Sequence, residues 1–545
     1  MKFVELAQVM EDIEACSSTT KMRGILATFL KRVSSEDIAA VAYMLSGAIS
    51  AEASDLNLGV ATKMMLRSIE EAFSSLRGRT MTAYKRHGDV GLVAQEGAQA
   101  RPSLLIQEVY TVLHQIARTQ GKGSAHQKVQ LLAGLLQQCS PLEARYLSRI
   151  VVAQLRLGSG RLLLLDALAV AYTGDVKDRD KIEAAYNVHP DIGEIARKLR
   201  LQGLKGIQGK KAGYFAPIKM MLAQRAHAIE DIKKRMDLIV AEEKYDGERI
   251  QAHKVENKVV LFSRRLDDIT AQFPDIVEAV KKDVKAKSCI LDGEAVPVDE
   301  RGDYLPFQLL MQRRRKYDVQ QYVKRIPVKY MVFDVLKVDD SVLMDLGYLS
   351  RREVLESIVK ESGSIGPARQ LRTKDINKVK GFFARCVKRG TEGIIAKSGD
   401  KNSPYRAGAR DWSWIKWKKD YVKGLMDTFD LVVVGAYRGR GRRAGSHGAL
   451  LCAAYNPKAR SFETLCKVGT GFSDEDLKRL PSRLKRFESG NQPSNVRCEK
   501  AMIPDRWYTP GQVVELEGAE LTLSSNHTCA REQGRGYALR FPRFL

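Results

Sequence analysis

Glu242-Glu243-Lys244-Tyr245-Asp246-Gly247-Glu248-Arg249 is the stretch that says most about the fold and chemistry of this chain. A lysine beside an Asp-Gly turn, with acidic neighbours and an arginine five positions on, is typical of a nitrogen nucleophile that attacks phosphorus. The ordinary alternative is a strand end with a solvated lysine and a turn. A free lysine has a pKa of about 10.4 and is neutral in roughly one molecule in 2,500 at pH 7. A reactive Lys244 therefore needs cations or a metal beside it, and the octet itself supplies mostly acids.

Three downstream segments offer companions for this lysine. The apolar run Val259–Phe262 ends at Ser263 and two arginines, follows a predicted hairpin turn at residues 256–258, and makes Arg264 a candidate contact for ribose or phosphate. A strand at Ile290-Leu291 is expected to run into an acidic turn at Asp292-Gly293-Glu294, where Glu294 could ligate a hard cation. The buried-strand run 330–336 carries Phe333, which could stack on a base.

Two further segments supply a carboxylate and the missing positive charge. Glu392 stands directly before a glycine and a strand pattern, whereas Glu294 stands directly after a strand pattern and a glycine. Glu392 is therefore a second candidate metal ligand. Trp414-Ile415-Lys416-Trp417-Lys418 alternates indole and ammonium, so Lys416 and Lys418 should project from one face of a strand. Each segment alone has an ordinary explanation as core, turn or surface. Their ordered combination predicts a single site.

The pattern K-x-D-G-x-R resembles the adenylation motif of covalent nucleotidyltransferases, and the chain as a whole resembles ATP-dependent DNA ligases of archaeal type, related to the eukaryotic replicative ligase. The resemblance implies that Lys244 accepts AMP from ATP, and that nicks in duplex DNA are sealed through an adenylated 5′-phosphate in replication, repair and recombination. It implies Mg²⁺ as a cofactor, with Glu294 and Glu392 as ligands. The implied nucleotide contacts are Glu242, Arg249, Arg264, Glu294, Phe333, Arg410, Lys416 and Lys418.

Composition agrees with a nucleic-acid partner. The chain has 90 basic and 65 acidic residues, a net charge of +25, which favours a polyanion through counterion release. An acidic substrate or an anionic membrane is the competing explanation. The expected partner is nicked double-stranded DNA, with a sliding clamp as a further candidate, and the protein is expected to be a monomer.

The length, the apolar runs and the cysteines of the chain further narrow the possible classes of protein. With 545 residues, 44% of them hydrophobic, the chain is long enough for several domains, each with a core. No apolar run of the sequence approaches the roughly 20 residues of a membrane span and no signal-peptide pattern opens it, so a soluble, cytoplasmic protein is expected. The eight cysteines include no Cys-x-x-Cys, which argues against structural zinc, disulfides and the bacterial NAD-dependent ligases with their four-cysteine zinc module.

We expect three domains: a helical DNA-binding domain over residues 1–210, an α+β nucleotidyltransferase domain over 211–423, and a β-barrel of the oligonucleotide-binding (OB) class over 424–545. In the first, Ser140-Pro141-Leu142-Glu143 is a strong helix start. The apolar spacing of Leu147, Ile150, Val151 and Leu155 continues that helix until Gly158. Short strand patterns at 429–437, 448–451 and 513–516 indicate the barrel.

Several basic segments are candidate DNA contacts. Gly121-Lys122-Gly123-Ser124, followed by Lys128, could present amides and ammonium groups to phosphate, so Gly123, Ser124 and Lys128 are predicted to bind DNA, and Arg156 more weakly. A flexible interhelical loop is the alternative. Residues 203–211 miss the spacing of a phosphate loop and are expected to be a linker. Arg438, Arg440, Arg442 and Arg443 predict a basic loop, either solvated or in contact with DNA.

The last residues of the sequence bear on the expected activity, and two other functions are alternatives to DNA ligation. Residues 540–545 resemble the start of the ligase family's last motif without its Arg-x-Asp-Lys continuation, so a truncated last domain with impaired self-adenylation is expected. RNA ligases and capping guanylyltransferases share the lysine motif, but the large basic helical region disfavours them. A non-catalytic DNA-binding scaffold would explain the charge but not the retained lysines and glutamates.

Overall fold

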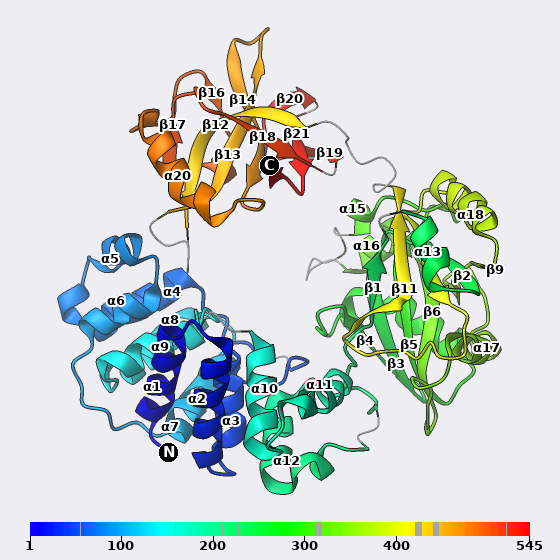
Figure 1. The fold of residues 1–545 in the computed structure, drawn as a ribbon, viewed down its shortest axis with the longest axis horizontal. Helices are drawn as coiled ribbons and strands as arrows, with labels where there is room; N and C mark the ends of the chain where they lie inside the picture. Colours follow the sequence, from blue (N-terminus) through cyan, green and yellow to red (C-terminus); the bar gives the residue numbers. More distant parts are fainter. Residues whose placement is uncertain are drawn as a thin grey trace. The chain divides into compact units, whose positions relative to one another are not determined.

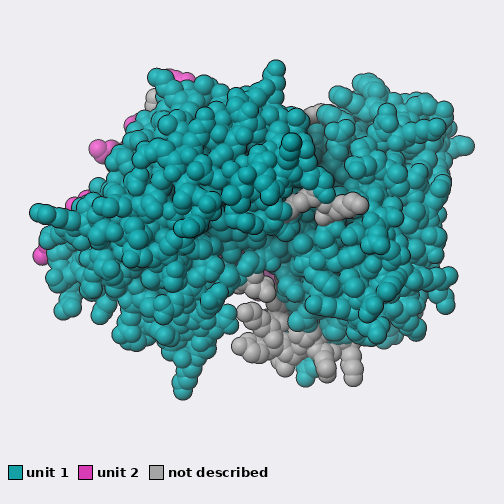
Figure 2. All heavy atoms as spheres, turned by 90° about the horizontal axis from the view of Figure 1, so that it is seen from below, with its two compact units in different colours: residues 1–77, 94–419 teal, residues 78–93, 420–545 magenta. Residues whose placement is uncertain are grey.

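The structure is a computed structural model that describes residues 1–545 apart from residues 55, 158–159, 210–211, 227, 311–312, 314–318, 420–427, 440–445, 519 and 533. The chain divides into two compact units, coloured separately in Figure 2: residues 1–77 with 94–419, and residues 78–93 with 420–545. The predicted domain boundaries at 210/211 and 423/424 both lie outside the described residues, so the three-domain division stays a prediction. In the described part of the chain, no helix is long and apolar enough to cross a membrane.

The first 209 residues form helices, as predicted, and their described part contains no strand (Figure 1). The helices are α1 (Phe3–Ala15), α2 (Thr19–Arg32), α3 (Ile38–Leu45), α4 (Thr62–Ala72), α5 (Thr80–His87), α6 (Val90–Gly97), α7 (Ile106–Arg118), α8 (Ser124–Gln137), α9 (Pro141–Val151), α10 (Arg161–Tyr172), α11 (Arg179–Val188) and α12 (Ile192–Gln202), with short 3-10 turns η1 (Ser74–Leu76), η2 (Val176–Asp178) and η3 (Gly203–Gly206).

The start of α9 confirms the predicted helix signature. Ser140 Oγ accepts a hydrogen bond from the Glu143 amide at 3.4 Å, and the Glu143 carboxylate accepts one from the Ser140 amide at 2.9 Å. The predicted end of this helix is wrong, because α9 ends at Val151. Ala153 takes a positive φ of 52°, and Leu155 packs close to Gly47 instead of extending the helix. The predicted stop at Gly158 lies outside the described residues.

The middle region contains two sheets. The first has the order β1-β11-β10-β2-β9, and the second has the order β4-β3-β5-β6-β7, with β8 paired to β6. The strands of the first are β1 (Leu222–Arg225), β2 (Ile239–Lys244), β9 (Gln370–Thr373), β10 (Gly393–Ser398) and β11 (Arg410–Lys418). Those of the second are β3 (Glu248–Val255), β4 (Lys258–Ser263), β5 (Ser288–Pro297), β6 (Val328–Val338), β7 (Ser341–Val342) and β8 (Ile365–Pro367).

Helices of this region are α13 (Glu230–Arg235), α14 (Pro274–Asp283), α15 (Phe307–Leu310), α16 (Val319–Arg325), α17 (Tyr348–Ile358) and α18 (Ile376–Lys388), with η4 (Thr270–Gln272). One core packs α14 and α17 against the second sheet, with Ile276 and Leu355 buried against Leu291. A second core joins the two sheets and contains Leu336 and Trp414. The two sheets therefore meet around β5, β6 and β11, which is where the site lies.

Two local predictions in the middle region have different outcomes. The hairpin turn is confirmed, because Val255 pairs with Lys258 across a two-residue turn. The acidic turn at Asp292-Gly293-Glu294 is wrong, because β5 continues through these residues, with an irregularity in its pairing with β6 between Asp292 and Gly293. Gly293 serves close packing: a Cβ there would lie 2.6 Å from the Tyr330 ring and 2.8 Å from the Met331 carbonyl oxygen.

The C-terminal region is rich in strands, in agreement with an OB-like half-barrel. Its larger sheet has the order β15-β17-β12-β13-β14-β16 with β18 and β22 attached, and its smaller sheet has the order β19-β21-β20. The elements are β12 (Phe429–Arg438), β13 (His447–Asn456), β14 (Ser461–Val468), α20 (Asp474–Lys485), β15 (Glu488–Ser489), β16 (Val496–Arg497), η7 (Lys500–Met502), β17 (Arg506–Tyr508), β18 (Val513–Glu517), β19 (Glu520–Ser524), β20 (Cys529–Glu532), β21 (Arg535–Arg540) and β22 (Arg543–Phe544). The three predicted strands are confirmed in β12, β13 and β18. Of the predicted basic loop, Arg440, Arg442 and Arg443 lie outside the described residues.

Candidate active site

A pocket of about 230 Å³ lies between the two sheets of the middle region and gathers most of the predicted site residues. Seven basic side chains and three acidic side chains line it, so its wall favours an anionic ligand. The lining side chains supplied by the first sheet and its flanks include Glu242, Glu243, Lys244, Lys397, Arg410, Trp414, Lys416 and Lys418; those supplied by the second sheet and its flanks are Arg249, Arg264, Glu294 and Phe333.

Lys244 is the last residue of β2, immediately before the predicted Asp246-Gly247 turn. Its Nζ lies 2.6 Å from Glu392 Oε2, and the Nζ of Lys418 lies 2.5 Å from the same oxygen. Register explains the meeting: Gly393 of β10 pairs with Lys244 on one side and with Lys418 on the other. Glu392, one residue before β10, is therefore fixed between the two lysines. About a fifth of each of the three side chains is exposed, so a ligand can reach them.

Three carboxylates surround the Lys244 ammonium group. Burial raises the pKa of Glu294 to about 7, although the charges of Lys244 and Arg249 oppose the rise. Burial followed by repulsion from Glu392 also raises the pKa of Asp246. Burial acts to raise the pKa of Glu392 as well, but the Lys244 and Lys418 ammonium groups outweigh it and lower that pKa. Carboxylate oxygens such as these are the hard donors that a divalent cation prefers.

Glu294 is the carboxylate best placed to take a metal. In the described part of the chain it has no hydrogen bond or ion pair, and it lines the pocket. Glu392 could serve as a second ligand if its oxygen turned from the two lysines. The donor set thus fits a hard divalent cation at this position.

The predicted concentration of positive charge is present. Lys416 and Lys418 are two residues apart on β11 and both line the pocket, as expected for one face of a strand. Burial lowers the pKa of Lys416, and the nearby charges of Arg410, Lys418, Lys244 and Arg264 lower it further. Four other cations, from β2, β11 and the end of β4, are therefore close enough to disfavour the protonated form of Lys416.

Arg249, predicted to contact the nucleotide, is held by the protein itself. Its Nε and Nη2 donate to the two oxygens of Asp292 at 3.0 and 2.7 Å, and its Nη1 donates to the Met221 carbonyl at 2.7 Å. The guanidinium also lies over the Phe333 ring, 5.3 Å from its centroid, within range of a cation–π interaction. Asp292 is fully buried, so this bond stabilises the base of the pocket. A direct contact of Arg249 with a nucleotide stays a prediction.

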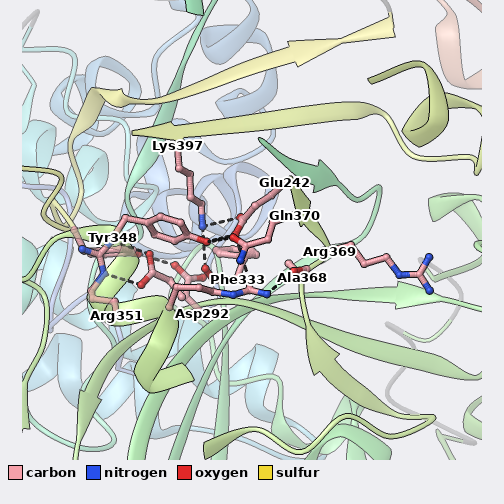
Figure 3. A network of polar contacts seen from close by, with 12 residues as sticks. Glu242, Asp292, Phe333, Tyr348, Arg351, Ala368, Arg369, Gln370 and Lys397 are labelled. Atoms are coloured by element: carbon pink, nitrogen blue, oxygen red, sulfur yellow. Dashed lines mark hydrogen bonds and ion pairs between the residues drawn. The ribbon is translucent and has the colours of Figure 1, made fainter. Parts of the chain in front are cut away.

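A buried polar network forms the back wall of the pocket (Figure 3). Lys397 is 1% exposed; its Nζ lies 2.8 Å from Glu242 Oε2 and donates to the Phe333 carbonyl oxygen at 2.9 Å. The other oxygen of Glu242 accepts from the Tyr348 hydroxyl and from Arg352 Nη1. In Figure 3 the side chains of Lys397 and Tyr348 both reach the Glu242 carboxylate. Glu242 is thus committed to three donors, and its predicted nucleotide contact is untested.

Two aromatic rings give the pocket a face suited to a flat ligand. Phe333 and Trp414 meet edge to face with centroids 6.0 Å apart, and both line the pocket. Trp414 is 4% exposed, and its Nε1 has no hydrogen-bond partner among the described residues. A buried N–H group without an acceptor costs free energy, so this indole is available to a ligand oxygen or nitrogen.

The predicted DNA-contacting residues lie in the helical region. Gly123 has a positive φ of 87° and precedes Ser124, the first residue of α8, in an exposed turn. Lys128 is buried and donates to the Leu58 carbonyl at 2.7 Å, so its ammonium group holds the chain near residue 58. Arg156 takes a positive φ of 62°. The structure does not test whether these four residues, Gly123, Ser124, Lys128 and Arg156, contact DNA. Their role in DNA binding stays a prediction.

The structure adds residues that the sequence reasoning did not select. Asp246 stood inside the starting octet, yet only the fold shows its carboxylate beside Glu392. Lys397 lies in the strand pattern that follows Glu392, and Trp414 belongs to the Trp-Lys alternation, in which only the two lysines were predicted to serve the site. Both residues lie in segments that the sequence pattern selected, but the pattern does not show that their side chains are buried against the pocket. Asp292 had no signal beyond its position next to Glu294.

Comparisons with known proteins agree with this geometry. The families described as "DNA ligase N terminus", "ATP dependent DNA ligase domain" and "ATP dependent DNA ligase C terminal region" match residues 2–169, 220–418 and 443–545. The chain is 42% identical over 560 residues to DNA ligase 1 of Methanosarcina acetivorans, covering 100% of this chain and 96% of the relative. It is 38% identical over 565 residues to the DNA ligase of Saccharolobus solfataricus, covering 100% and 94%.

Among solved structures, the chain is similar to one titled Pmar-Lig_PreS3. The TM-score is 0.58 at 17% sequence identity, and the similarity covers 99% of this chain and 98% of that chain. At this identity the similarity concerns the fold alone.

Proposed function

The chain belongs to the ATP-dependent DNA ligases, enzymes that seal nicks in DNA, and we propose that Lys244 is the residue that carries AMP during this reaction. The observation that supports the proposal most is the placement of Lys244. It lies in a pocket with six other basic side chains, and its Nζ is 2.6 Å from the Glu392 carboxylate.

In the first step, Lys244 loses a proton and its nitrogen attacks the α-phosphorus of ATP. A P–N bond forms, the bond to pyrophosphate breaks, and pyrophosphate leaves with the electron pair. Glu392 is the nearest base for the departing proton. Lys416 and Lys418 stabilise the negative charge that develops on the phosphate oxygens, because both line the pocket in which the phosphate binds.

In the second step, a 5′-phosphate oxygen at the nick attacks the phosphorus of AMP, and the P–N bond to Lys244 breaks. The lysine nitrogen takes back a proton. In the third step, the 3′-hydroxyl loses its proton and attacks the 5′-phosphate; a phosphodiester P–O bond forms, and AMP leaves with the electrons of the bond that breaks. Splitting the reaction in this way couples an unfavourable condensation to the cleavage of ATP into AMP and pyrophosphate.

The proposal also assigns the metal and the remaining contacts. Glu294 and Glu392 would hold Mg²⁺, which supplies charge neutralisation at the phosphate oxygens when bound. Phe333 and Trp414 offer a flat apolar surface to the base, and Arg264 and Arg410 line the pocket for ribose or phosphate. A three-domain division with boundaries near residues 210 and 423 is proposed on the same grounds. Roles in replication, repair and recombination, a sliding clamp as partner and a monomeric state are proposals of the same kind.

Incubation with ATP labelled at the α-phosphate tests the assignment of Lys244. We expect label on the wild-type protein and none on Lys244→Ala, while Lys287→Ala, an exposed lysine outside the pocket, stays labelled. Peptide mass spectrometry should place the adduct on Lys244. Nicked-DNA binding should be nearly unchanged in Lys244→Ala. Label on another lysine, or loss of DNA binding in that variant, would contradict the proposal.

A further inference from the structure

Trp412 is an unusual residue for its position on β11. The chain has four tryptophans, and Trp414, Trp417 and Trp507 are buried, whereas Trp412 is 39% exposed. Relative to β1, strand β11 bulges between Asp411 and Ile415, because Ala223 pairs with Asp411 while the next residue of β1 pairs with Ile415. The bulge turns Trp412 away from the core. An exposed indole forgoes the burial that normally stabilises this side chain.

Arg235 covers one face of this indole. Its guanidinium carbon lies 4.1 Å from the centroid of the Trp412 ring, and Figure 1 shows α13 beside β11. Arg235 ends α13 after Lys233 and Lys234. Those two lysines are paired with Asp237 and Asp231 at 3.1 and 3.3 Å. Arg235 itself is exposed and has no ion pair in the described part of the chain, so its charge is available to a partner.

The position of this pair relative to the pocket identifies a partner. Trp412 precedes Lys416 by four residues, at most about 13 Å at a rise of roughly 3.3 Å per residue. One DNA strand advances about 3.4 Å per nucleotide, so this distance corresponds to roughly four nucleotides. A DNA strand that leaves the pocket along β11 would therefore bring its phosphates and sugars close to this edge of the sheet, about four nucleotides from the nick.

We infer that Trp412 and Arg235 form a contact surface for the sugar–phosphate backbone of the nicked duplex, a few nucleotides from the nick. Arg235 neutralises one phosphate, and the free face of the indole packs against a deoxyribose. This surface lies outside the nucleotide pocket and serves DNA binding, not lysine adenylation. The inference rests on the proposed role of Lys244, because the position of the nick is taken from that residue.

Binding of a fluorescently labelled nicked duplex to the full chain, without ATP and over a series of KCl concentrations, tests the inference. Removing one phosphate contact should lower the slope of log affinity against log salt by about one in Arg235→Gln. Trp412→Ala should bind roughly tenfold more weakly with a nearly unchanged slope, and Trp412→Phe should recover part of that loss. Lys287→Gln is the matched control, since it removes an exposed charge beside the turn at the far end of β3, and it should leave the slope unchanged.

Lysine adenylation without DNA, measured on the same variants, separates this surface from other roles. It should proceed at the wild-type rate in Trp412→Phe and Arg235→Gln. Slower adenylation without DNA would mean that the pair acts within the protein, and unchanged DNA binding in both variants would also overturn the inference. Failure of the wild type to label Lys244 would instead refute the proposed function, whatever the variants bind.

Discussion

Glu294→Gln should stabilise the nucleotide-free protein at alkaline pH. Burial raises the pKa of Glu294 from its ordinary value of 4.5 to about 7, which corresponds to about 3.4 kcal/mol at 1.36 kcal/mol per pKa unit. Because the folded protein binds this proton more tightly than the unfolded chain, the free energy of unfolding falls as pH rises from 4.5 to 7. Above pH 7 the folded protein carries the full free-energy cost of burying the charged Glu294 carboxylate. Glutamine has the same shape and no charge, and it avoids that cost.

Partial exposure of Glu294 reduces the expected gain to about 1–3 kcal/mol at pH 8, with a difference near zero at pH 4.5. Urea unfolding followed by tryptophan fluorescence is a suitable assay, since three of the four tryptophans lie on β11. Glu278→Gln, at an exposed glutamate of α14, controls for charge removal alone. The reasoning is refuted if Glu294→Gln is less stable than wild type at pH 8, or if its stability difference is the same at both pH values.

Four further changes have defined outcomes. Glu392→Ala should raise the Mg²⁺ concentration needed for half-maximal lysine adenylation, and an unchanged metal titration would count against its role as a ligand. Arg249→Met should destabilise the protein by about 3–5 kcal/mol in urea unfolding, because Asp292 is left buried without its counter-ion; a loss under 1 kcal/mol would contradict this. Trp414→Phe keeps an aromatic ring but replaces the indole and removes its N–H group, so the KM for ATP should rise about threefold to tenfold at constant kcat, and an unchanged KM would show that the indole does not bind the nucleotide. Ser140→Ala should lower the free energy of unfolding by about 1 kcal/mol, because it removes the N-cap of α9, and Ser140→Asp should keep most of that stability. Equal stability of Ser140→Ala and wild type would show that the cap contributes nothing.

Patterns within a few residues of one another were predictable from the sequence. The capping residues of α9, the turn between β3 and β4, and the shared face of Lys416 and Lys418 each follow from local backbone geometry. The same local reasoning failed where packing overrode it. The apolar spacing through Leu155 continued past the end of α9, because that segment packs near Gly47. Asp-Gly predicted a turn at Gly293, where Tyr330 instead requires a residue without a Cβ.

The amino-acid order alone determined which residues are candidates for the chemistry of this protein, since a lysine, its glutamates and its basic partners are recognisable by type and spacing. Only the tertiary structure decided how they are divided between tasks. The pairing of Gly393 with Lys244 brings Glu392 to a lysine 148 positions away, and the packing of the two sheets commits Arg249 to Asp292 and Lys397 to Glu242. Strand register and burial are set by contacts across the whole fold. Two side chains of the same type can therefore differ in pKa, partners and access to a ligand.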